Sequence, residues 1–375
     1  MSGLKGKKYY TNKGKVTTFT SSGYYHAKET RNIDYLVVAG GGGGGAWYAG
    51  GGGAGGFLTS RDESFPVTAG TTYKITVGSG GSHGFNRGFY AWFSCAGGGM
   101  GGDSSIAAGG TALVTAKGGG GGAGWAHGGN SLVYDGAYSG GSGGGAVGGT
   151  AYYDGSSPTH PHNNAGHPIH WSGWGALGTP GQGNDGGSAW EKVKPLPTTY
   201  WGSRCGGGGG GAGGAGQDGG PGPAPTQDGG DGLASDITGS SVTYAGGGGG
   251  ARMGYGWWGE GGTGGGGKGG HGPLNAAYGY PSPTYYHDAE DGTTNTGGGG
   301  GGGCTGTYPA SAGGAPDGIS EGPSGYVGHG AGGAGGSGIV VILEPATTGT
   351  ESSTGGGVHS MKNIYTSRIK DEWPE

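Results

Sequence analysis

Short stretches in which apolar and polar side chains alternate predict β-strands that run directly into glycine. The clearest strand is Ile33 to Val38, which is followed, after one alanine, by six glycines. Segments rich in Thr, Val and Ile at 57–77, 101–119 and 231–247 contain turn residues and are typical of hairpins. We therefore expect short strands and hairpins that lead into, or out of, glycine-rich segments.

The glycine runs carry small side chains with a spacing of three in two places: Ala331, Ala334 and Ser337, and Ala212 and Ala215. A period of three belongs to the polyproline-II geometry, which has three residues per turn and no internal hydrogen bonds. Bare glycine edges would let such helices approach at about 4.8 Å, so that each N–H and C=O bonds a neighbouring helix. Disordered linkers, the alternative, need neither this period nor bracketing strands. The runs lie at 40–45, 50–56, 97–102, 118–124, 140–149, 206–216, 246–250, 261–270, 297–303 and 330–338.

If the runs are traversed up and down, the connections between them fall into two chemically different sets. One set contains the predicted hairpins and indicates a β-rich base; the other holds most of the tryptophans and indicates a crown of aromatic loops. Residues 150–182 and 271–296 belong to the base by this count, yet they are long and aromatic. Either the number of runs is miscounted there, or the base also carries insertions. The crown connections are 46–49, 82–96, 125–139, 188–205, 251–260 and 304–329.

Composition and charge exclude several classes of protein. The chain has 375 residues, of which 114 are glycine, and a net charge of −5, which argues against a nucleic-acid-binding protein. No apolar run is long enough to insert into a membrane, and the basic N-terminus lacks the apolar core of a secretory signal. Three cysteines give no disulfide framework. We expect synthesis in a cytoplasm followed by assembly elsewhere.

Four stretches carry a resemblance to a known family: "IDYLVVAGGGGGG", "GGDSSIA", "VTYAGGGGG" and "GGSGIVVI". They resemble the glycine-rich proteins of phage tails, among them the adhesin at the tip of long tail fibres in some T-even-like phages. The resemblance covers about 33–344 and implies a mainly non-helical, β-like fold. In that fold, packed polyglycine-II helices form a sandwich, with short strands and hairpins at one end and variable loops at the other.

The resemblance also implies a function and a place of work. The expected protein is a phage virion structural protein, a receptor-binding adhesin that contacts a host glycan or outer-membrane protein and other tail or fibre proteins. The alternative is a structural appendage, a capsid fibre or extracellular filament, whose glycine body stacks against its own copies as a homo-oligomer. Residues 1–32 are expected to be an attachment or first-strand segment, 33–344 the glycine-rich domain, and 345–375 a linker and tail.

Aromatic side chains on a rigid body are the candidate receptor contacts. Tyr and Trp supply amphipathic contact area at low entropic cost, although we expect about half of the crown aromatics to cover the ends of the glycine lattice. The candidates are Trp47, Tyr48, Phe89, Tyr90, Trp92, Trp125, Trp190, Tyr200, Trp201, Trp257 and Trp258.

Other chemistry is weakly indicated. The loop "HPHNNAGHPIH" could bind a transition metal through His160, His162, His167 and His170, or it is a polar surface loop. The cysteines are expected to fill space where runs meet loops, with a Cys95–Cys205 bridge as an alternative. The "DGGDG" at 228–232 could hold calcium but is more typical of a turn. A G-x-S-x-G match at Ser142 lacks its strand-to-helix context. We therefore predict no enzyme and no cofactor.

Overall fold

The computed structural model describes most of residues 14–346, and the predicted non-helical, β-like class is confirmed for the described part of the chain. The described residues are 14–60, 65–85, 97–124, 137–148, 169–170, 173–191, 204–220, 227–253, 258–272, 287–304, 306–308 and 327–346. Their strands are β1 (Lys15–Phe19), β2 (Gly23–His26), β3 (Arg31–Val38), β4 (Phe57–Thr59), β5 (Phe65–Val67), β6 (Thr72–Thr76), β7 (Ser104–Ala108), β8 (Thr111–Ala116), β9 (Ala137–Tyr138), β10 (Ile169–His170), β11 (Trp190–Glu191), β12 (Arg204–Cys205), β13 (Leu233–Ser235), β14 (Val242–Tyr244), β15 (Arg252–Met253), β16 (His271–Gly272), β17 (Gly306–Tyr308), β18 (Val327–His329) and β19 (Ile339–Glu344).

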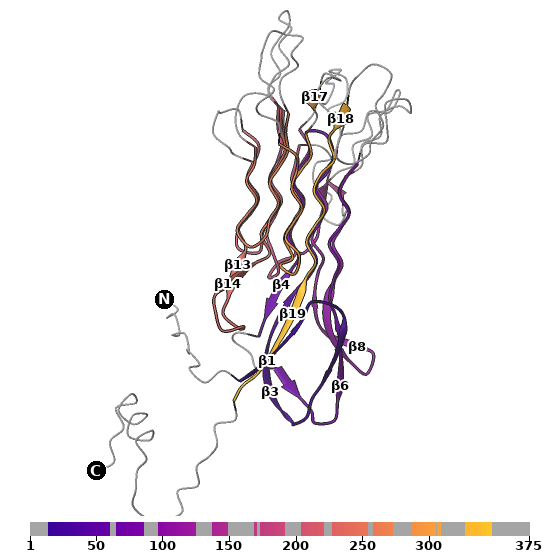
Figure 1. The fold of residues 1–375 in the computed structure, drawn as a ribbon, viewed down its shortest axis with the longest axis vertical. Helices are drawn as coiled ribbons and strands as arrows, with labels where there is room; N and C mark the ends of the chain where they lie inside the picture. Colours follow the sequence, from indigo (N-terminus) through magenta and orange to yellow (C-terminus); the bar gives the residue numbers. More distant parts are fainter. Residues whose placement is uncertain are drawn as a thin grey trace, which may run out of the picture. The chain divides into compact units, whose positions relative to one another are not determined.

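Two antiparallel sheets form the base of the glycine-rich unit, at the lower end in Figure 1. One sheet has the order β1-β19-β3-β4, with β5 also paired to β3, and the other has the order β2-β6-β7-β8. Ile33 and Val37 of β3 pack into a core shared with Ile75 and Ile106 of the second sheet. The alternation of side chains along β3 therefore directs every second residue into the space between the sheets.

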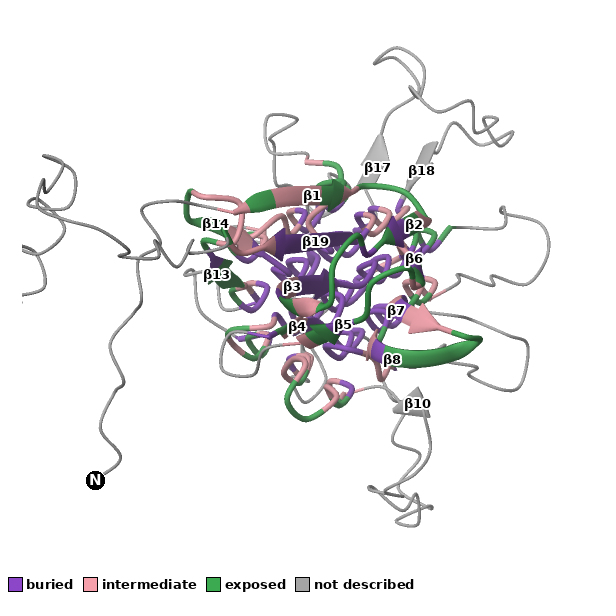
Figure 2. Ribbon diagram, turned by 90° about the horizontal axis from the view of Figure 1, so that it is seen from below, coloured by how far each residue is buried: buried purple, intermediate pink, exposed green. Residues whose placement is uncertain are grey.

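The C-terminal end of β3 is buried, as its purple colour in Figure 2 shows, and this includes the residues on its opposite face. Leu36 and Val38 pack with Phe57, Val341 and Tyr244, the last of which ends the β13–β14 hairpin. Burying each such aliphatic side chain contributes about 1.5–3 kcal/mol. This two-sided burial explains why the strand becomes a continuous apolar run just before it enters the glycines.

Above the base, each glycine run continues as an extended rod whose backbone bonds its neighbours. In the rod 39–45, the N–H groups of Gly40 and Gly43 donate to one neighbour (Gly102 and Gly99), three residues apart on both rods. Gly41 and Gly44 donate to a second neighbour, and Gly42 and Gly45 to a third. A direction that repeats every third residue is the polyglycine-II pattern inferred from the sequence.

The rods form an inner group enclosed by an outer ring. The inner rods are bonded on all sides and consist largely of bare glycine: 39–45, 50–56, 141–148, 206–211, 246–251 and 297–303. Each outer rod bonds the next one, and the ring closes: 78–84, 97–102, 118–124, 137–140, 173–178, 183–189, 215–220, 227–232, 258–263, 266–272, 287–293 and 330–338. The outward positions of the last rod, Ala331, Ala334 and Ser337, are partly exposed, as the period of three predicts.

Three runs predicted as single rods instead reverse direction: 140–149, 206–216 and 261–270. Gly264 and Gly265 make one reversal with φ values of 97° and 101°, which glycine adopts without strain. Another reversal lies between Ala212 and Ala215, so their spacing of three belongs to a turn and not to a rod. The number of runs was therefore miscounted, and no base insertion is needed at 150–182 or 271–296. The described residues beside both segments lie away from the sheets, because Gly148 donates to Tyr48 and His271 pairs with His287.

The described ends of the glycine-rich unit lie side by side at the base. Lys15 of β1 pairs with Glu344 of β19, with 3.4 Å between Nζ and Oε1, and Arg31 donates to the carbonyl of Pro345. Because β1 and β2 each join a sheet, the described part of residues 1–32 belongs to this unit as strands. Residues 346–375 form a separate unit.

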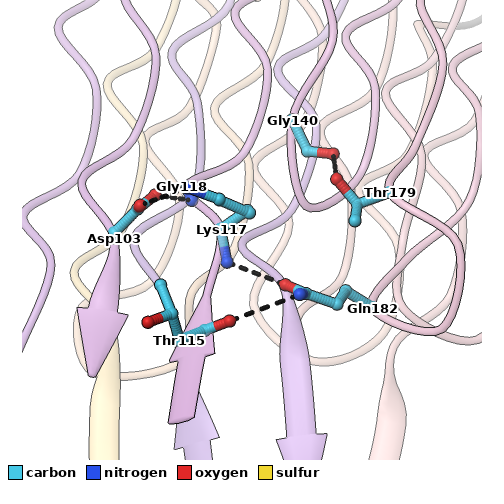
Figure 3. A network of polar contacts seen from close by, with 7 residues as sticks. All are labelled: Asp103, Thr115, Lys117, Gly118, Gly140, Thr179 and Gln182. Carbon is cyan, nitrogen blue, oxygen red and sulfur yellow. Dashed lines mark hydrogen bonds and ion pairs between the residues drawn. The ribbon is translucent and has the colours of Figure 1, made fainter. Parts of the chain in front are cut away.

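Aspartate side chains accept further backbone N–H groups between neighbouring rods of the outer ring. The Asp228 and Asp231 carboxylates accept the N–H groups of Glu260 and Thr263 at 2.8 and 3.0 Å, and Asp291 accepts that of Ala334 at 2.7 Å. Figure 3 shows the same device at Asp103, which accepts the Gly118 N–H at 2.8 Å. We call these contacts aspartate clasps, and Asp185 and Asp218 make two more. Each clasp supplies the acceptor that a further rod would otherwise provide.

Candidate functional site

We call the end of the lattice that lies away from the sheets the crown. The turn that joins the first two inner rods lies at this end. Trp47 and Tyr48 make this turn with φ values of 66° and 49°, an unusual conformation for bulky residues. Tyr48 is buried against Ala251 and Cys304, and the two aromatic rings meet edge to face at 6.3 Å. Tyr48 therefore covers the ends of the inner rods and is not an accessible contact, while Trp47 is partly exposed.

A second aromatic group lies where three adjacent outer rods reach the crown. Trp258 begins the rod 258–263, His271 lies near the end of 266–272, and His287 begins 287–293. The backbones of the two histidines exchange hydrogen bonds of 2.8 and 3.2 Å. The Trp258 indole stacks on the His287 imidazole at 4.7 Å and 22°, and His271 meets its edge at 6.5 Å. The lattice thus holds an indole in a fixed plane at its rim.

Charged side chains surround this indole. The Trp258 Nε1–H donates to Glu260 Oε1 at 3.0 Å, and Glu260 Oε2 lies 3.3 Å from Lys268 Nζ. On the other side, His287 Nε2 lies 3.6 Å from Glu290 Oε1. The side chains of Glu260, Lys268 and Glu290 are each about 40–50% exposed, so these groups remain available to a ligand. We call the six residues the Trp258 network.

A buried guanidinium lies deeper in the crown. Arg252 is almost fully buried, and its carbonyl accepts the Cys304 thiol at 3.0 Å. Burial raises the pKa of the neighbouring Cys205 thiol, an effect that the positive charge of Arg252 partly opposes. Cys205 and Cys304 are buried, as expected of space-filling thiols, and because Cys205 forms no disulfide, the alternative Cys95–Cys205 bridge is not formed.

Most of the other predicted contacts lie outside the described residues. Trp190 lies in β11 and His170 in β10, each described by its backbone only. The remaining candidates lie outside the described residues: Phe89, Tyr90, Trp92, Trp125, Tyr200, Trp201, Trp257, His160, His162 and His167. Of the predicted aromatic contacts, the structure therefore places the side chains of Trp47, Tyr48 and Trp258.

The aspartates considered as calcium ligands have structural partners. Asp228 and Asp231 form clasps, as does Asp291, and burial is the main cause of a raised pKa at Asp228. Within the described part of the chain, no group of three or more His, Cys, Asp or Glu side chains is placed to hold a metal ion. Ser142 is fully buried in an inner rod.

Sequence reasoning selected Trp258 but not the residues around it. His271 and His287 each adjoin a segment between rods, and Glu260, Lys268 and Glu290 interrupt glycine-rich outer rods. A polar residue next to a rod end would have been the usable signal. The order of the rods, which brings these five side chains to Trp258, could not be known from spacing alone.

A strand base that carries a backbone-bonded glycine lattice defines a glycine-rich structural domain. The chain belongs to the glycine-rich domain family, whose model matches residues 17–345. A comparison with curated proteins finds no match. Among the described residues, there is no helix of the length and apolarity needed to cross a membrane.

Proposed function

We propose that this protein is a virion structural protein that acts as the receptor-binding adhesin at the tip of a phage tail fibre. Its host receptor is a surface glycan or an outer-membrane protein, and its other partners are tail or fibre proteins. The glycine lattice supports this proposal because a rigid platform lowers the entropy cost that loops incur on binding. Loops on rigid scaffolds commonly carry binding residues.

The observation that carries the proposal is the polarity of the glycine-rich unit. Both of its described ends lie at the base, where Lys15 pairs with Glu344. The aromatic-rich connections, including those at Trp47 and Trp258, join rods at the opposite end. Attachment through the base would leave the crown free to meet a cell.

The aspartate clasps favour this proposal over a stacked filament. An open rod edge presents unpaired N–H groups that a second copy could bond, as the edge strands of sheets do. Asp218, Asp228, Asp231 and Asp291 occupy such groups and place like charges on three rods of the outer ring. A body built to stack laterally on its copies would leave these groups available.

The test is adsorption of particles that carry altered crowns. Replacing both Trp257 and Trp258 by alanine should reduce host adsorption at least about tenfold, since a few aromatic anchors usually dominate an interface. Tyr24→Ala provides the control, because Tyr24 is 62% exposed on β2 in the base. Unchanged circular dichroism would verify that the variants fold. Adsorption that persists after every crown loop has been exchanged would rule out the adhesin.

A further inference from the structure

The Trp258 network combines an aromatic surface with both hydrogen-bond donors and acceptors at the rim of the lattice. Stacking on His287 and the bond to Glu260 fix the indole in two directions. Two acidic side chains and one basic side chain are held on separate rods: Glu260 on 258–263, Glu290 on 287–293 and Lys268 on 266–272. Such a site needs little rearrangement to bind a ligand, which is the usual condition for affinity from few contacts.

The charges of the network restrict the class of ligand. Two carboxylates accompany one ammonium group, so a phosphate or an acidic sugar would meet net repulsion. Carboxylates accept hydrogen bonds and ammonium donates them, and a sugar hydroxyl can do both. The C–H face of a pyranose ring, in turn, packs well against an indole.

We infer that the Trp258 network is a binding subsite for a neutral pyranose on the flank of the crown. The inference rests on the proposed receptor-binding function and narrows its ligand from any surface receptor to a neutral saccharide. The pyranose ring packs on the exposed part of Trp258. Its hydroxyls donate to Glu260 and Glu290 and accept from Lys268.

Binding of small sugars to the full-length protein tests this inference. The probes are methyl β-glucopyranoside, methyl β-galactopyranoside and N-acetylglucosamine, with N-acetylneuraminic acid as the acidic comparison. Saturation-transfer NMR should show at least one neutral probe bound with a Kd in the millimolar range, which corresponds to about 4 kcal/mol. The acidic sugar should bind more weakly.

Three variants locate the site. Trp258→Leu should raise the Kd of the neutral probe at least about tenfold, because aromatic anchors usually contribute much of the binding free energy. Glu260→Gln, which keeps an acceptor but loses the charge and the ion pair with Lys268, should weaken it severalfold without threatening the fold. Trp174→Leu is the matched control, because Trp174 is 61% exposed on a different outer rod, and it should bind as the wild type does.

The outcomes separate this inference from the adhesin proposal. The subsite would be overturned if no neutral sugar binds, or if the acidic sugar binds more tightly than the neutral ones. It would also be overturned if the Trp258→Leu and Glu260→Gln variants bind the neutral probe as tightly as the wild type does. If crown exchange still abolishes host adsorption in that case, the adhesin proposal stands and the receptor is recognised elsewhere in the crown. If sugar binding maps to Trp258 while crown exchange leaves adsorption intact, the adhesin proposal fails and the subsite remains.

Discussion

A single methyl group placed inside the lattice should destabilise the protein severely. Gly300 lies in the inner rod 297–303, and its N–H and C=O bond Gly42 and Gly52 in two other inner rods. A Cβ at this position would lie less than 3.0 Å from the carbonyl oxygens of Gly333 and Ala334. Both are backbone atoms, so no side-chain rotation can relieve the clash.

The cost of Gly300→Ala follows from the bonds that the clash must stretch. The rods 297–303 and 330–338 are joined by hydrogen bonds of 2.8 Å from Gly333 to Gly301 and from Gly336 to Gly298. Separating them enough to admit a methyl group takes these bonds outside the usual 2.7–3.2 Å range. Unpaired buried groups cost about 1–3 kcal/mol each, and overpacking adds about 1–3 kcal/mol. With one unpaired group at each of these two bonds, we expect a loss of about 3–9 kcal/mol, a large fraction of the stability of a typical domain.

Urea unfolding followed by tryptophan fluorescence gives the measurement, with Gly214→Ala as the matched control. The nearest atom to a Cβ at Gly214 is the Asp231 nitrogen at 3.6 Å, an ordinary contact, and its φ is not left-handed. This variant should stay within about 1 kcal/mol of the wild type, with a slight gain from the stiffer unfolded chain. If Gly300→Ala proves as stable as Gly214→Ala, the rods do not pack through their backbones as described.

Two further predictions concern the clasps and the base. Asp228→Ala should lower the free energy of unfolding in urea by about 1.5–3 kcal/mol, because it removes a charged acceptor from the Glu260 N–H. Asp228→Asn keeps an acceptor oxygen and should recover most of the lost stability. An equal loss of stability in both variants would contradict the clasp. Burial, reinforced by the Glu344 carboxylate, raises the pKa of Tyr25 from 10.0 to about 12, so the folded state holds this proton more tightly than the unfolded state. The stability from this group is complete below pH 10 and is lost as pH rises toward 12. Tyr25→Phe should flatten that part of the curve, and an unchanged alkaline slope would show that other groups cause it.

The strands and the bonding principle could be predicted from the sequence because side chains determine them. Alternation predicted the strand at Ile33–Val38, which the structure extends to Arg31–Val38, and the spacing of Ala331, Ala334 and Ser337 revealed the period of the rods. The reversals could not be predicted, because glycine serves equally well in a rod and in a turn. Nothing distinguishes Gly264 from its neighbours until its φ of 97° is known.

The candidate site was predictable only in part, for the same reason. Trp258 could be selected as an aromatic residue beside a run, but its partners come from other rods, and hidden turns determine which rods are adjacent. The burial of Tyr48 could not be separated from the exposure expected of a loop residue, since its turn packs on Ala251 and Cys304 from distant parts of the chain.

The bare inner rods have a consequence for how the chain finds its alignment. A run such as 297–303 looks the same to its neighbours after sliding by three residues, since each step of three restores the direction of every amide. No interior contact penalises such a slip, whereas one residue out of place in an ordinary sheet exposes its apolar face. The correct alignment must therefore be imposed from outside the glycines, by strands such as β3 and β19 below and by Asp228 and Asp231 at the rim. Those few side chains therefore fix the register of rods whose own sequence does not specify it.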